Sequence, residues 1–153
     1  MIKKITLSAA AIFAFASAMA DAATWDPRVE FVKDLYRSGK INDFDGERLD
    51  PMLVFGTAKL KKLAHDADAA TPEGEMGWND YDIYYQTQDL CDDFKNMKFS
   101  VQQGKVRVDL PQAKSWVMFD VICSADKCEL DDVIDSAGKA SDRLAEHINY
   151  YKK

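Results

Sequence analysis

The stretch FSVQQGKVRVDLPQAKSWVMFDVICSADKCELDDVI, residues 99–134, decides the class of fold. In its first part, apolar and polar residues alternate on both sides of a turn at Gln103 and Gly104. The alternating apolar residues are Phe99, Val101, Val106, Val108 and Leu110. A period of two places them on one face, so this part predicts a β-hairpin whose other face meets water. Residues 116–123 and 128–134 form a second β-rich pair around a turn at residues 124–127, so the stretch predicts four antiparallel strands.

Helical patterns lie on both sides of these strands. Asp26-Pro27 and Asp50-Pro51 each combine a helix-capping residue with a proline suited to the first turn. The helix that begins at Pro51 is expected to end within residues 65–77, which are rich in Ala, Asp, Pro and Gly. Residues 136–151 carry apolar residues at helical spacing. The sequence therefore predicts an α+β domain with N-terminal helices packed on an antiparallel sheet of about four strands and a C-terminal helix.

The first twenty residues have the layout of a cleavable signal peptide. Lys3 and Lys4 give a positive start, residues 5–16 are mostly apolar, and Ala18-Met19-Ala20 supplies the small residues of a cleavage site. An apolar run of this length spans about 18 Å, short of the ~30 Å hydrocarbon core, so a membrane anchor is not expected. We therefore expect a signal peptide at residues 1–20, export to the periplasm and a single α+β domain at residues 21–153.

The composition is that of an acidic globular protein. The chain has 153 residues, of which 47% are hydrophobic and 30% charged, and this balance excludes a disordered or collagen-like chain. Its formal charge is −6, and loss of Lys3 and Lys4 with the leader leaves 18 basic and 26 acidic residues, a charge of −8. Such a protein repels phosphates and attracts basic surfaces. We expect no nucleic-acid partner and a protein partner with a basic surface; the oligomeric state stays open.

Export also decides how the three cysteines are interpreted, because nearby pairs usually form disulfides in an oxidising compartment. Cys123 and Cys128 flank the turn of the second predicted hairpin, where paired positions lie within reach of a disulfide. We expect a Cys123–Cys128 bond. Cys91 is then left over, either as a buried thiol or as a site of intermolecular pairing.

Patterns for catalysis, metals and cofactors are absent from the sequence. There is no G-x-S-x-G string, and the two histidines, His65 and His147, have no neighbouring ligands of the kind a zinc site needs. Two partial calcium loops lack an oxygen ligand at their twelfth position. We expect no catalytic residues, no metal and no cofactor. Enzyme activity stays open as a carboxylate or His147 in an apolar pocket, or as His147 brought to Cys91 by the fold. Strand alternation allows at most one of Asp131 and Asp132 to point inward.

Residues 78–94 are aromatic with polar residues between the rings, and we expect a loop with a short helical or extended piece. Flat rings beside hydrogen-bonding groups suit peptide or sugar recognition, and Tyr and Trp are frequent interface anchors. The alternative is that these rings cover the open edge of a small core. An acidic segment after the second hairpin is the other candidate contact. The candidate binding surface consists of Trp78, Tyr81, Tyr84, Tyr85, Asp131, Asp132 and Asp135.

Several short strings resemble an envelope protein family. They are VKDLY at 32–36, FDG followed by LDP at 44–51, YDI leading to QD at 81–89, and LDDV at 130–133. The family is domain-of-unknown-function family 3828, in the nuclear-transport-factor-two-like superfamily with a cystatin-like cone. The resemblance covers about residues 27–133 and implies a curved antiparallel sheet wrapped by helices into a cone with a pocket. Two departures are Cys128, where an aromatic residue is expected, and a longer final helix. The resemblance implies a shape rather than a reaction, since that fold hosts both enzymes and binding domains.

Two functions follow as hypotheses. The first is an exported, non-catalytic periplasmic protein that acts through protein–protein contacts, in its sharpest form an immunity or inhibitor protein. The second is a domain that binds a small ligand or a cell-wall fragment in the cone. The second requires an open apolar pocket that reaches Tyr84 or Tyr85, and a cone filled by its own side chains would argue against it.

Overall fold

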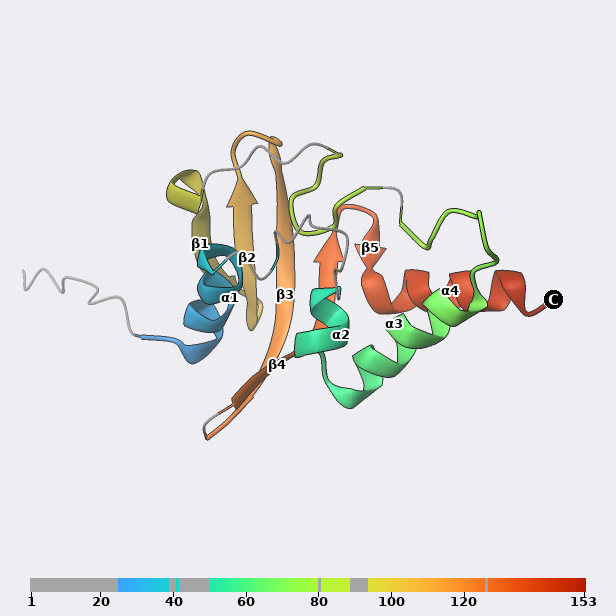
Figure 1. Cartoon of the computed structure of the whole chain (residues 1–153). Coiled ribbons are helices and arrows are strands. Elements are labelled where there is room, and N and C mark those ends of the chain that lie inside the picture. The colour runs from blue at the N-terminus through green and yellow to red at the C-terminus, as the bar shows by residue number, and fades with distance from the viewer. Residues whose placement is uncertain (1–24, 39–40, 42–49, 80, 89–93, 126) are drawn as a thin grey trace, which may run out of the picture.

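The computed structural model describes residues 25–38, 41, 50–79, 81–88, 94–125 and 127–153 (Figure 1). The predicted signal peptide and Cys91 lie outside these residues. The helices are α1 (Pro27–Arg37), α2 (Pro51–Phe55), α3 (Ala58–Ala70) and α4 (Ala140–Tyr151), with a 3₁₀ turn, η1 (Phe94–Asn96). The strands are β1 (Lys98–Gln102), β2 (Lys105–Leu110), β3 (Ser115–Ser124), β4 (Lys127–Asp135) and β5 (Gly138–Lys139).

The five strands form one antiparallel sheet in the order of the sequence. This arrangement confirms the α+β class and both predicted hairpins, with one more strand than expected. The extra strand is β5, whose two residues pair with the end of β4 and are too few to show a period of two. The pairing of β3 with β4 shifts after Asp120, where Asp131 is the extra residue on β4.

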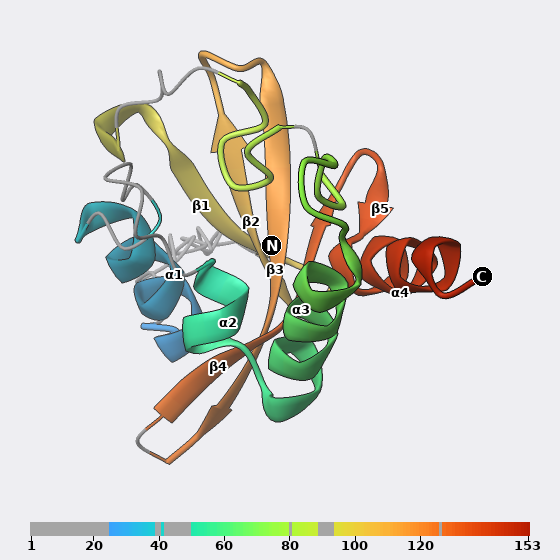
Figure 2. The ribbon, with the colours of Figure 1, turned by 45° about the vertical axis from the view of Figure 1, so that its right-hand side comes forward.

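One face of the sheet carries the core, and α1 and α2 lie over this face (Figures 1 and 2). Alternate residues of the three central strands are buried there, as the period of two predicts. They are Val106, Val108, Leu110, Val117, Phe119, Val121, Leu130 and Val133. The opposite face of β2 carries Arg107 and Asp109, which pair with each other at 2.8 Å and meet solvent.

Both Asp-Pro signals begin helices as predicted. The Asp26 carboxylate accepts a bond from Arg28 N at 2.9 Å, and the Asp50 carboxylate accepts one from Met52 N at 2.8 Å. Each aspartate therefore satisfies an N–H group that has no partner within its helix.

The prediction of one second helix was wrong, because the chain forms α2 and α3 with a break at Gly56. Gly56 forms a β-bridge with Leu130, and Thr57 N donates to Leu130 O at 2.7 Å. A Cβ atom on Gly56 would lie 2.2 Å from Met52 O, so the turn between the two helices requires glycine at this position. Helix α3 ends at Ala70, within residues 65–77 as predicted, and Ala64 and Ala67 are buried on it.

Helices α3 and α4 lie side by side beyond the β5 edge of the sheet and run toward the same end of the molecule (Figures 1 and 2). Helix α4 begins at Ala140 rather than at Ser136, because the intervening residues form the turn to β5. Leu144 and Ile148 are buried, and they lie on the face of α4 that the helical spacing of apolar residues predicts to face the core. None of the described helices is long and apolar enough to cross a membrane.

The predicted Cys123–Cys128 disulfide is present. The two residues are directly paired in the β3–β4 hairpin, and their Cα atoms are 4.0 Å apart. The bond therefore joins two strands that the sheet has already placed next to each other.

Candidate functional site

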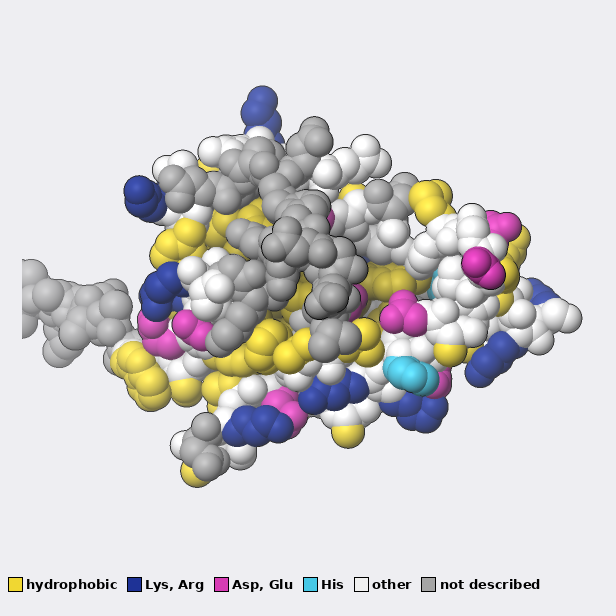
Figure 3. Space-filling view, in the orientation of Figure 1, with side chains coloured by type: hydrophobic (Ala, Val, Ile, Leu, Met, Phe, Trp, Pro, Cys, Tyr) yellow, Lys and Arg dark blue, Asp and Glu magenta, His cyan; other side chains and the backbone are white. Residues whose placement is uncertain are grey.

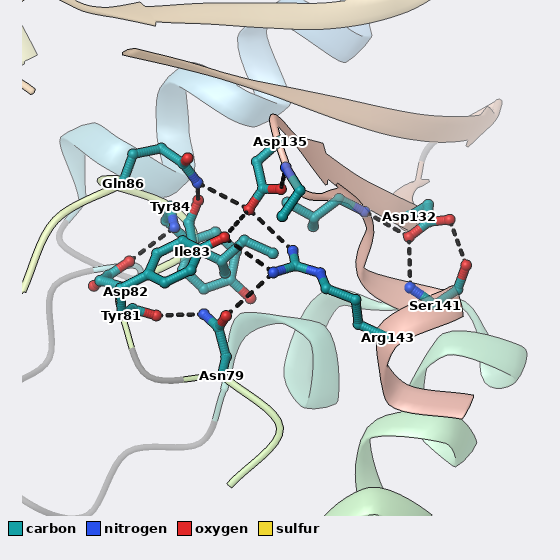
Figure 4. A network of polar contacts seen from close by, with 12 residues as sticks. Asn79, Tyr81, Asp82, Ile83, Tyr84, Gln86, Asp132, Asp135, Ser141 and Arg143 are labelled. Atoms are coloured by element: carbon teal, nitrogen blue, oxygen red, sulfur yellow. Dashed lines mark hydrogen bonds and ion pairs between the residues drawn. The ribbon is translucent and has the colours of Figure 1, made fainter. Parts of the chain in front are cut away.

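A polar network lies where the end of β4, the start of α4 and the loop of residues 78–88 meet (Figure 4). Its centre is Asp135, the last residue of β4, whose side chain is completely buried. Two predicted surface residues, Asp135 and Tyr81, meet here, and Arg143 of α4 joins them. The loop is held in this position by hydrogen bonds from Tyr81, Tyr84 and Gln86 to carboxylates at the end of β4 and at the start of α2.

Both oxygens of the Asp135 carboxylate accept hydrogen bonds from other groups of the protein. Its Oδ2 atom accepts bonds from the Tyr81 hydroxyl at 2.7 Å, from Gln86 Nε2 at 3.1 Å and from Arg143 Nη2 at 2.9 Å, while Oδ1 accepts Ala137 N at 2.8 Å. Burial acts to raise the pKa of Asp135, but the bonds from Tyr81 and Gln86 and the Arg143 charge outweigh it, so the pKa lies below its ordinary value. A carboxylate held in this way is ionised and is a poor proton acceptor for catalysis.

Arg143 connects the helix to the loop. Its Nη1 atom donates to the Tyr81 hydroxyl at 3.0 Å and to Asn79 Oδ1 at 3.2 Å. The guanidinium also lies over the Trp78 ring, 5.3 Å from its centre. The Nε atom is buried and has no hydrogen-bond partner within the described part of the chain. Arg143 therefore holds Trp78, Asn79 and Tyr81 together on the side of α4.

Asp132 has a different role from Asp135, since it caps α4 from the neighbouring strand. Its oxygens accept Ser141 N at 3.1 Å and the Ser141 hydroxyl at 2.6 Å (Figure 4). Lys139, at the N-cap position, offers no side-chain cap, so Asp132 supplies the acceptor that this helix end needs. Asp131 is only partly buried and accepts a bond from the Thr57 hydroxyl at 3.1 Å. One of the two carboxylates is therefore buried, and it is committed to a helix end.

Tyr84 and Tyr85 belong to the core and not to a surface, with exposed fractions of 5% and 2%. The Tyr84 ring stacks on Phe119, and its hydroxyl donates to Asp50 at 2.6 Å. Tyr36 donates to the Tyr84 carbonyl at 2.7 Å and meets the Tyr85 ring edge-on. These two rings are therefore part of the core, and neither forms an exposed binding surface.

The two groups of the Tyr84–Asp50 bond both have raised pKa values. Burial raises the pKa of Asp50, although the bonds from Tyr84 and Met52 N partly offset the effect. Burial and the nearby Asp50 charge raise the pKa of Tyr84 well above its ordinary value. This pair fixes the middle of the loop to the start of α2, while Asp135 bonds Tyr81 and Gln86 on either side of Tyr84.

Residues 71–79, which we call the strap, lie along one side of α4. The strap contacts α4 through Arg143 and His147, which are four residues apart and share one face. The Thr71 hydroxyl donates to Ala67 O at 2.9 Å, so its oxygen accepts the 2.7 Å bond from His147 Nε2. At Tyr151, partial burial and the charge of Glu75 raise the pKa of the phenol, which places Glu75 near the end of α4.

Sequence reasoning missed Arg143 and Ser141, the α4 residues that bind Asp135 and Asp132. The sequence does carry one signal for the strap, since Arg143, His147 and Tyr151 form a polar line at helical spacing. The sequence does not show that the strap is the segment that packs against these residues.

The chemistry of the network is structural. The described residues contain no group of three His, Cys, Asp or Glu side chains able to hold a metal ion. The acceptors of Asp135 and Asp132 are occupied by donors from the protein itself. Neither carboxylate is therefore in position to receive a proton from a substrate.

Comparison with family models, with curated proteins and with solved structures found no match. The resemblance to family 3828 therefore stays a prediction.

Proposed function

We propose that this is an exported, non-catalytic periplasmic protein that binds a protein partner with a basic surface. An immunity or inhibitor role is the sharpest form of this proposal. The observation that carries it is that the buried carboxylates and rings of the candidate site are all used in holding the fold. Recognition is then left to the outer surface of a protein with a formal charge of −6.

The disulfide supports the location. A half-buried cysteine pair joined at the end of a hairpin is typical of a protein that matures in an oxidising compartment. Together with the predicted leader, it favours the periplasm.

The alternative, a small-ligand or cell-wall-fragment site inside the cone, has less support. It requires an open apolar pocket at Tyr84 or Tyr85, and both rings are buried among Tyr36 and Phe119. A ligand in this place would have to displace the Tyr84–Asp50 bond and the stacked rings.

The test is affinity capture from a periplasmic extract with the mature protein as bait. At low salt we expect one stoichiometric protein with a basic surface, and we expect the bait itself to begin after Ala20 and to contain the Cys123–Cys128 bond. Absence of any stoichiometric partner at low salt would contradict the proposal, and a bait that keeps Lys3 and Lys4 would contradict export.

A further inference from the structure

The outer edge of β1 is a row of backbone groups without partners. Strand β1 is the last strand on one side of the sheet, and within the described chain it pairs with β2 alone (Figure 2). The turn between the two strands has two residues, so Gln102 and Lys105 form a hydrogen-bonded pair, and the backbone groups of Phe99 and Val101 point away from β2. No residue that the structure describes bonds these outward groups. The edge therefore offers N–H donors and carbonyl acceptors in the spacing of a strand.

The same edge also exposes an apolar side chain. Phe99 and Val101 lie on the inner face of the sheet, because their partners on β2 are buried. Phe99 packs against Phe94, with ring centres 5.6 Å apart, whereas Val101 is 43% exposed. Figure 3 shows hydrophobic side chains on this side of the molecule. The segment that fits the edge is therefore an extended strand with apolar side chains at alternate positions.

Strand β1 of a second copy meets these requirements. In an antiparallel pair centred on Ser100, Phe99 of one copy is opposite Val101 of the other, and these two residues exchange their outward bonds. On the other face of the sheet Lys98 is opposite Gln102, so like charges do not face each other. The strand carries no carboxylate, which limits the repulsion between two acidic copies at this edge.

The backbone favours this register over its neighbours. A shift by one residue would place outward groups of one copy against groups that bond β2 in the other. A shift by two in one direction brings in Met97, whose N–H already donates to Phe94 O at 3.2 Å. A shift by two in the other direction brings in Gln103, which lies in the turn with a φ of 51°. Pairing centred on Ser100 uses outward groups of the strand alone.

We propose that β1 binds β1 of a second copy in this register, so that two sheets join across a two-fold axis. The inference goes beyond the proposed function and does not depend on it. Each copy contributes the five residues of β1, fewer than the about 20 to 30 residues a side of a stable interface. The dimer is therefore weak and forms at high protein concentration.

Disulfide trapping tests the register directly. Ser100→Cys places two new thiols opposite each other, on Cα atoms about 4.5 Å apart, and the Cys123–Cys128 bond of this chain joins strand residues that are paired in the same direct way. Gln102→Cys is the matched control, since its two thiols would lie about 14 Å apart along the strands. At about 100 µM protein with a mild oxidant, we expect most of Ser100→Cys to become a covalent dimer. Gln102→Cys should behave like the wild type, which accounts for Cys91.

A second variant tests the outward bonds. Val101→Pro removes an outward N–H and no bond to β2, whereas Val101→Thr keeps the N–H and the branched shape. By sedimentation equilibrium, Val101→Pro should raise the dissociation constant of the dimer at least about tenfold, and Val101→Thr should change it less than about threefold. Circular dichroism checks that both variants fold; if Val101→Pro does not, the trapping experiment decides.

Equal trapping of the two cysteine variants, or a wild-type mass that does not rise with concentration, would overturn the inference. Salt separates it from the proposed function. Between about 50 mM and about 300 mM salt, a dimer of two acidic copies should keep its affinity or gain some, whereas binding to a basic partner should weaken. A dimer that dissociates as salt is added would therefore also contradict pairing through β1.

Discussion

At the scale of single residues, the fold depends on buried charges that pair with each other. The Arg143–Asp135 pair is the clearest case, because the Asp135 side chain has no exposed surface and Arg143 is its only described cation. Removing one member of such a pair leaves the other charged and buried, and this costs more than the pair itself contributes.

We therefore expect Arg143→Ala to lower the free energy of unfolding by about 3–5 kcal/mol, as measured by urea denaturation at pH 7. The control is Lys62→Ala, which breaks a solvent-exposed pair with Asp66 and should cost less than about 1 kcal/mol. Similar losses in the two variants would show that the network does not stabilise the fold.

Asp50 gives a prediction of pH dependence. Burial raises its pKa, so the folded state holds this proton more tightly than the unfolded chain does, and its ionisation costs stability as the pH rises through the folded pKa. Asp50→Asn should keep the acceptor for Met52 N and Tyr84 without the charge. We expect the variant to be more stable than the wild type at pH 7.

At a pH below about 3.9, where Asp50 is protonated in both states, the advantage of Asp50→Asn should disappear. Asp66→Asn is the control, since the pKa of Asp66 is lowered by its bond to Lys62 and the sign of its pH dependence is reversed. A constant difference between Asp50→Asn and the wild type from pH 4 to 7 would contradict the assignment.

At the scale of elements, the ends of helices and hairpins are fixed by contacts with other parts of the chain. Helix α4 is capped by Asp132 across nine positions of sequence, through Ser141 N and the Ser141 hydroxyl. We expect Asp132→Ala to cost about 1–2 kcal/mol and to reduce amide-exchange protection in the first turn of α4. Asp131→Ala, which loses only a bond to Thr57, should leave that protection unchanged.

The disulfide is expected to contribute modestly, because it joins residues only five positions apart. If the bond acts by reducing the entropy of the unfolded chain, closing a loop of this length adds about 2 kcal/mol to the free energy of unfolding. Cys123→Ser with Cys128→Ser should lose this amount in thermal or urea unfolding. Reductant should destabilise the wild type equally and the double variant not at all; a further loss in the double variant would point to another essential bond.

At the scale of the whole molecule, the sequence predicted the sheet better than the helices. The alternation in β2–β4 reports directly which face is buried, so it predicts strands without knowledge of the rest of the fold. The break between α2 and α3 depends on the approach of Gly56 to Leu130, which no local pattern encodes. Strand β5 is likewise defined only by its partner.

The candidate site was predicted only in part, because the residues that complete it lie far away in the sequence. The sequence picks out Asp132, Asp135 and Tyr81 as unusual, but their partners on α4 lie outside any local motif. Tyr84 and Tyr85 were placed on a surface because tyrosine suits both interfaces and cores, and only the position of Phe119 and Asp50 decides between the two.

The central claim is that an acidic, non-catalytic protein recognises a basic protein partner through its charge. The most direct measurement is the dissociation constant of the captured partner at about 50 mM and about 300 mM salt. Electrostatic attraction between exposed charges is screened over this range, so we expect binding to weaken by about tenfold or more, mainly through a slower association rate. A dissociation constant that does not change with salt would contradict the claim.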